Sequence, residues 1–145
     1  MSKDTDLTRF PYLKDVLTNV EVAYIATFPP TECGIATFTQ DVVSSVRKFT
    51  PFSNPHVIAM NPPGETEVYA DIVECQVDKE TAEDYDAAAR YVNESSVDVL
   101  MVEHEFGIYG GDHGDYVLRM MEQIRKPMIV TLHTVLAAPN PKQKE

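Results

Sequence analysis

The sequence predicts an α/β fold in which an open, doubly wound and mainly parallel sheet is covered by helices on both faces, giving three α/β/α layers. Short runs rich in β-branched residues alternate along the chain with segments whose apolar residues recur every three or four positions. Two of the runs, VDVLMV and PMIVTL, are apolar almost throughout, which is typical of parallel strands buried on both faces. The 145 residues match one domain, and 43% apolar with 24% charged residues is ordinary globular composition.

Five segments are predicted as strands. The first is rich in β-branched and aromatic residues and stops at Pro29-Pro30. No helical pattern separates the third strand from the second, whereas a predicted helix connects every other pair of consecutive strands. In chain order, the predicted strands are Glu21–Phe28, His56–Met60, Asp71–Val77, Val97–Val102 and Pro127–Leu132.

Three helices are predicted between these strands. The first begins at Ile35 and is stopped by Pro51. Before the second, Thr81 and Asp84 resemble a capping box, and Asp115 can cap the third. The inner faces are Ile35, Phe38, Val42, Val46 and Phe49 for the first helix, Ala82, Tyr85, Ala89 and Val92 for the second, and Val117, Met120, Met121 and Ile124 for the third.

Composition excludes several classes of function. A formal net charge of −11 repels nucleic acid and anionic lipid, so neither is an expected partner. The longest apolar stretches, such as Val22–Phe28, are far shorter than the roughly 20 residues that cross a bilayer, and no signal-peptide core follows the polar N-terminus. Cys33 and Cys75 provide no disulfide framework and fit no zinc pattern. We therefore expect a cytoplasmic protein with a loosely packed arm at residues 1–20 and one domain at residues 21–145.

Residues suited to ligand binding follow the first and fourth predicted strands. In open parallel sheets, ligands bind beyond the carboxyl ends of the strands. Gly34 lies at the start of the first helix, where free N–H groups and the helix dipole favour an anion, although this glycine can equally serve only to turn the loop into the helix. Gly110 and Gly111 lie in the glycine-rich loop after the fourth strand and permit close backbone approach to a bound molecule.

Two histidines, His104 and His133, each follow an apolar strand directly. A histidine at a strand end is usually a hydrogen-bonded structural residue, but two of them at adjacent positions of the ligand edge make a functional role about equally plausible. The chain lacks GxGxxG, GxxxxGK[ST], GxSxG and HExxH, so we expect no cofactor and no standard hydrolase site. We also expect no metal site, because the spacing fits no metal motif in the cluster Glu103, His104, Glu105, Asp112 and His113.

Three segments of the sequence resemble the N-terminal domain of group 1, or family 4-like, retaining glycosyltransferases. They are FPPTECGIATFTQDV at Phe28–Val42, VEHEFGIYGG at Val102–Gly111 and KPMIVTLHTVL at Lys126–Leu136. The resemblance covers roughly residues 21–138, and its specificity comes from three separated motifs in the correct order. It implies a GT-B fold, in which two Rossmann-like domains enclose the active site, and the N-terminal domain mainly binds the acceptor.

The resemblance also implies roles for individual residues. Gly34 matches a glycine whose backbone lies near the donor diphosphate, and Cys33 stands where many members have a second glycine. The N–H groups of Gly34 and Ile35 would then face the charge that develops on the leaving diphosphate. His133 matches a histidine that lies against the transferred sugar and is the expected catalytic-site residue. His104 and Glu105 match a loop that lines the cleft. No protein nucleophile is assigned.

The function expected from the resemblance is transfer of a sugar from a nucleotide-sugar donor to a sugar or lipid-like acceptor. The sequence holds no donor-binding domain with a Glu-x7-Glu motif, so we expect the first domain of an enzyme, cut short or encoded separately, with little activity unless a C-terminal donor domain acts in cis or in trans. The alternative is a non-catalytic Rossmann-like binding or interaction module that uses an apolar surface for a partner.

Overall fold

The computed structural model describes residues 20–50 and 53–141. Nearly all of the expected arm at residues 1–20 and the expected helix stop at Pro51 lie outside the described residues. Within them, one parallel sheet has the strand order β3-β2-β1-β4-β5. The strands are β1 (Val22–Ala26), β2 (Pro55–Asn61), β3 (Val73–Asp78), β4 (Val99–His104) and β5 (Met128–Leu132). This Rossmann-like α/β fold is the one that the sequence predicts.

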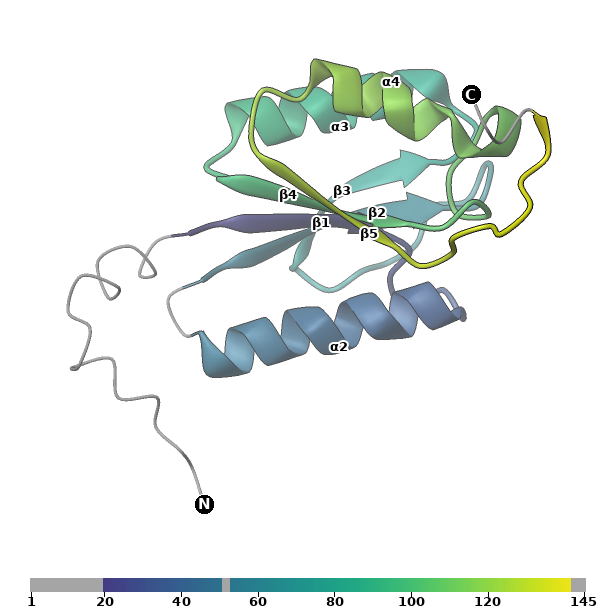
Figure 1. Ribbon diagram of the computed structural model, residues 1–145. Helices are drawn as coiled ribbons and strands as arrows, with labels where there is room; N and C mark the ends of the chain where they lie inside the picture. Colours follow the sequence, from purple (N-terminus) through teal and green to yellow (C-terminus); the bar gives the residue numbers. More distant parts are fainter. Residues whose placement is uncertain (1–19, 51–52, 142–145) are drawn as a thin grey trace.

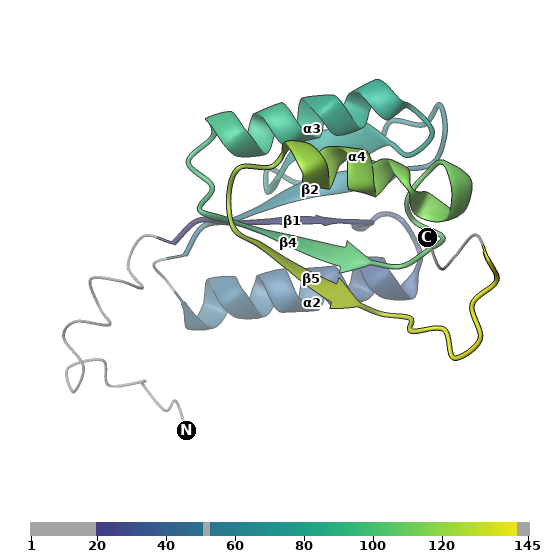
Figure 2. The same cartoon turned by 45° about the horizontal axis from the view of Figure 1, so that its top comes forward.

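Helices cover both faces of the sheet. Helix α2 (Gly34–Phe49) lies on one face, whereas α3 (Ala82–Glu94) and α4 (Tyr116–Gln123) lie side by side on the other, as the two views show (Figures 1 and 2). The strand order reverses at β1, because the chain runs outward to β2 and β3 and then returns to place β4 on the other side of β1. The loops after β1 and β4 therefore diverge at the position where such sheets bind ligands.

Two apolar clusters hold the layers together. Beneath α2, the buried side chains include Tyr24, Val43 and Val57. Beneath α3 and α4, the larger cluster includes Ile25, Tyr85 and other fully buried side chains. Successive side chains of β1 point to opposite faces of the sheet, so Tyr24 belongs to the first cluster while its neighbours Ala23 and Ile25 belong to the second. The buried faces of α3 and α4 agree with the predicted apolar patterns. For α2 the predicted inner face was wrong: Ala36, Thr39 and Val43 are buried, whereas Phe38 and Phe49 are 40% and 71% exposed.

The helix starts differ from the predicted capping. Thr81 occupies the N-cap of α3 but makes no side-chain cap hydrogen bond. The Asp84 carboxylate instead accepts a hydrogen bond from the backbone N–H of Asp78 at 2.9 Å, which ties the helix to the end of β3. Asp115 precedes α4 without a side-chain cap, because a short 3-10 helix, Asp112–Gly114, leads directly into it. The prediction of a capping box was therefore wrong, although both helices begin where expected.

The last strand is less buried than the sequence predicts. Leu100 and Val102 of β4 are fully buried, but in β5 the exposed fractions are 54% for Ile129, 40% for Val130 and 57% for Leu132. Strand β5 is the outer strand and pairs only with β4 among the described residues, so its apolar composition does not produce burial on both faces. No helix in the described part of the chain is long and apolar enough to cross a membrane.

Candidate functional site

The three segments chosen from the sequence meet at the carboxyl edge of the sheet. The backbone N–H of His133 donates to the carbonyl of His104 at 3.0 Å, which joins the ends of β5 and β4. The Phe38 ring of α2 contacts the His133 ring edge-on, with 4.8 Å between the ring centroids. We call the edge formed by Gly34, His104 and His133 with their loops the carboxyl rim.

His133 is held by a buried carboxylate. Its Nε2 lies 2.8 Å from Oε2 of Glu103, whose side chain is only 2% exposed. The other ring nitrogen, Nδ1, has no protein partner within residues 20–50 and 53–141, and it is not a buried atom. The imidazole of His133 is thus fixed through Nε2, and its Nδ1 is left open to a hydrogen bond from a ligand.

His104 points to the other face of the sheet. Its ring stacks on Tyr109, with 6.0 Å between centroids, and meets Phe106 edge-on. Its Nδ1 is buried and has no hydrogen-bond partner among the residues that the structure describes. The ring borders a mainly apolar hollow of about 200 Å³ that also contacts Leu132 and Thr134. The Thr134 hydroxyl donates to the Glu105 carboxylate, which fixes the chain just beyond His133.

Helix α2 begins with an open turn. Cys33 is its N-cap, and the sulfur accepts a hydrogen bond from the N–H of Ala36 at 3.4 Å and lies 3.0 Å from the Thr27 hydroxyl. The N–H groups of Gly34 and Ile35 have no hydrogen-bond partner among the described residues. A Cβ on Gly34 would meet no atom of the described residues within 4 Å, so the Cβ position of this glycine is open. The arrangement can accept an anion.

A second hollow of about 210 Å³ lies beside this turn. Thr27, Cys33 and Asn61 line it together with Lys79 and the loop after β4. Among the described residues, Lys79 is the one cation in its lining. Sequence reasoning did not select Lys79, because it lies after β3 and becomes a neighbour of α2 only through the strand order.

Gly110 and Gly111 pack against other parts of the protein. A Cβ on Gly110 would lie 1.7 Å from the carbonyl oxygen of Lys79, and its N–H donates to the Tyr85 hydroxyl at 2.9 Å. Burial raises the pKa of Tyr85 to about 12, so the phenol stays protonated. The N–H of Gly111 donates to Glu80. The structure therefore brings both glycines against the β3–α3 connection rather than beside His133.

The opposite, amino-terminal edge carries its own histidine. His56 is 6% exposed, with Nε2 2.6 Å from Glu21 and Nδ1 2.6 Å from Glu74. A hydrogen bond from Ser96, and secondly one from His56, lowers the pKa of Glu21. A hydrogen bond from the Tyr91 hydroxyl is the main cause that lowers the pKa of Glu74. These contacts link the residue before β1 to β2, β3 and α3, so His56 connects four segments of the chain.

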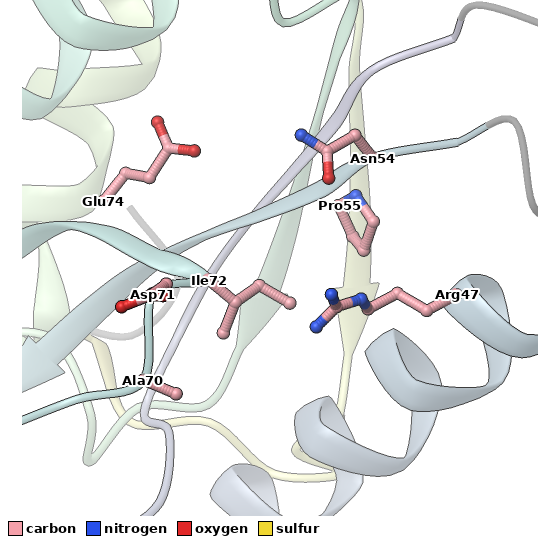
Figure 3. A pocket seen from close by; sticks show the side chains of 7 residues that line it. All are labelled: Arg47, Asn54, Pro55, Ala70, Asp71, Ile72 and Glu74. Atoms are coloured by element: carbon pink, nitrogen blue, oxygen red, sulfur yellow. The ribbon is translucent and has the colours of Figure 1, made fainter.

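A hollow of about 380 Å³ also lies at the amino-terminal edge. Figure 3 shows Arg47 extending from the end of α2 toward Ile72 and Pro55, with Glu74 on the far side. It is larger than the two hollows at the carboxyl rim. The carboxyl rim is nevertheless the better candidate site, because parallel sheets place helix N-termini and loop ends there, whereas this hollow faces the C-terminal end of α2.

The fold and the rim define the class of protein as a Rossmann-like parallel α/β domain. The chain matches no protein-family model, and no curated protein matches it. In the described part of the chain, no three histidine, cysteine, aspartate or glutamate side chains are arranged to hold a metal ion.

Proposed function

We propose that this chain forms the acceptor-side domain of a retaining glycosyltransferase, which moves a sugar from a nucleotide-sugar donor to an acceptor. The observation that carries the proposal is the meeting of all three glycosyltransferase-like segments at one rim. Phe38 from the first segment contacts His133 from the third, and Glu103 and His104 from the second hydrogen-bond to the same histidine.

The rim offers the two kinds of group that this reaction needs. The leaving diphosphate develops negative charge, and the free N–H groups at Gly34 and Ile35 lie at the positive end of the α2 dipole. A sugar must also be held in place, and Nδ1 of His133 can accept a hydrogen bond from one of its hydroxyls. Most contacts to the nucleotide would come from a donor-binding domain acting in cis or in trans.

The test is residue-resolved NMR on the full chain, because it detects binding at millimolar affinity. Titration to about 10 mM with UDP-glucose, GDP-mannose or ADP-glucose should shift the amide signals of Gly34, Ile35 and His133 for at least one donor. His133→Ala should reduce these shifts, whereas the control His113→Asn, at an exposed histidine, should leave them unchanged. Absence of rim shifts with every donor would count against the proposal.

The second candidate is a non-catalytic interaction module. It is favoured by the exposed apolar side chains of β5, which continue into Val135, 78% exposed. This candidate predicts no response at Gly34 to any nucleotide sugar, so the same titration separates the two functions.

A further inference from the structure

We propose that Glu103 is a positioning residue that holds His133 with its proton on Nε2, so that Nδ1 accepts a hydrogen bond from a hydroxyl of a neutral ligand. The ligand half of this inference rests on the proposed function, which places a sugar at His133. The positioning half concerns the chain alone and can be tested without a ligand.

The position of Glu103 in β4 accounts for the pairing. Glu103 pairs with Thr131 in the register of β4 and β5, so its side chain lies on the same face of the sheet as that of His133, two residues after Thr131. Its carboxylate is buried, and His133 is its one side-chain hydrogen-bond partner among the described residues. A buried carboxylate needs donors, and therefore the Nε2 atom that faces it must carry a proton.

The imidazole is restrained on more than one side. Phe38 packs edge-on against the ring, and the backbone of His133 is fixed by its hydrogen bond to His104. Rotation of the ring by half a turn would break the contact with Glu103 and leave the carboxylate without a partner. Glu103 therefore determines both which nitrogen is protonated and which nitrogen is open to a ligand.

The charge of the pair indicates the kind of ligand. Glu103 makes no ion pair with lysine or arginine in the described part of the chain, and His133 is its partner. The pair of a carboxylate and a neutral imidazole has a net charge of −1, and the pair of a carboxylate and an imidazolium has a net charge of zero. Neither state attracts a phosphate, whereas a hydroxyl can donate to Nδ1 when the imidazole is neutral. The structure thus separates a position for neutral hydroxyls at His133 from the anion-binding turn at Gly34.

The positioning half is tested by ¹⁵N-resolved NMR of the imidazoles in the full chain. In the unchanged protein, His133 should show a proton on Nε2 that exchanges slowly with water, and an unprotonated Nδ1. Glu103→Gln keeps an acceptor but removes its charge, so the proton should remain and its signal should move upfield. Glu103→Leu should yield a mixture of both tautomers, with the Nε2 proton lost to fast exchange.

Three outcomes would overturn the positioning role: a proton on Nδ1 in the unchanged protein, an unaltered signal in Glu103→Gln, or the Nε2 form retained in Glu103→Leu. If Glu103→Leu does not fold, the first two measurements still decide the matter. Glu122→Gln on the exposed face of α4 is the matched control and should change nothing at His133.

The ligand half is tested by adding glucose and inorganic phosphate separately. Glucose should shift the Nδ1 signal of His133, and phosphate should not. A response to phosphate alone, or to neither, would overturn the preference for neutral hydroxyls. A nucleotide sugar that binds only at Gly34 would leave the proposed function standing while refuting the ligand half of this inference. An Nε2 proton on His133 without binding of any donor would refute the proposed function and leave the positioning half standing.

Discussion

The two edges of the sheet each hold a histidine against glutamate, and they use it differently. At the amino-terminal edge, both ring nitrogens of His56 lie 2.6 Å from carboxylate oxygens, and both can donate only when the ring is protonated. At the carboxyl rim, one nitrogen of His133 faces Glu103 and the other has no protein partner within the described residues. The same residue types thus form a structural contact at one edge, where both ring nitrogens have partners, and a candidate binding position at the other, where one nitrogen has none among the described residues.

Two glycines repeat this contrast. Gly110 is enclosed by the backbone at Lys79, whereas Gly34 faces open space at the start of α2. His56 and Gly110 are thus enclosed by other residues, whereas His133 and Gly34 lie at the open carboxyl rim. Each of these four residues can be substituted separately.

The largest expected effect comes from the glycine pair. Gly110→Ala should lower the free energy of unfolding by about 3 kcal/mol or more, because the new Cβ collides with backbone that cannot move aside. Gly34→Ala should change it by no more than about 0.5 kcal/mol, since the position is exposed and helical. Urea denaturation measures both variants. Equal losses of stability in the two variants would contradict the view that Gly110 is enclosed and Gly34 is open.

A smaller effect is expected at the amino-terminal edge. His56→Ala should cost about 2 kcal/mol, because it leaves Glu21 and Glu74 without their shared partner. Partial exposure of both carboxylates lets water offset part of the loss, which keeps the cost below that of a fully buried pair. Denaturant unfolding gives the cost, with His113→Asn as the control. The response of the rim to nucleotide sugars should persist, and its disappearance would show that the two edges are coupled.

The smallest effect appears in acid. Glu21 and Glu74 have lowered pKa values in the folded protein, so their contribution to stability is fully present above pH 4.5 and is lost as pH falls through their folded pKa values. Stability measured between about pH 5 and 3 should therefore fall more steeply in the unchanged protein than in Glu21→Gln/Glu74→Gln. Parallel profiles would mean that these carboxylates are equally accessible to protons in the folded and unfolded chain.

Much of the fold could be predicted from the sequence, because its signals are local. Proline after the first strand, helical spacing of apolar residues from Ile35 to Phe49, and apolar runs in the later strands place the elements to within a few residues. The exposure of β5 could not be predicted, since the pattern PMIVTL does not reveal that this strand lies at the edge. The capping by Asp84 depends on the end of β3, which local spacing does not show.

The candidate site was only partly predictable for a related reason. The sequence indicates that His104 and His133 end neighbouring strands, but strand register decides which face each side chain occupies. Register pairs Glu103 with Thr131 and so brings Glu103 to His133, across thirty positions of sequence, while His104 turns to the other face. Because β4 begins with the apolar run VLMV, its composition does not reveal which face each of its residues occupies.

The most direct test of the carboxyl rim compares the imidazole signals of His56 and His133 while the full chain is titrated with UDP-glucose, GDP-mannose and ADP-glucose. We expect the Nδ1 signal of His133 to shift with at least one donor and the signals of both His56 nitrogens to stay unchanged. A response at His56 alone, or at neither histidine, would contradict this expectation.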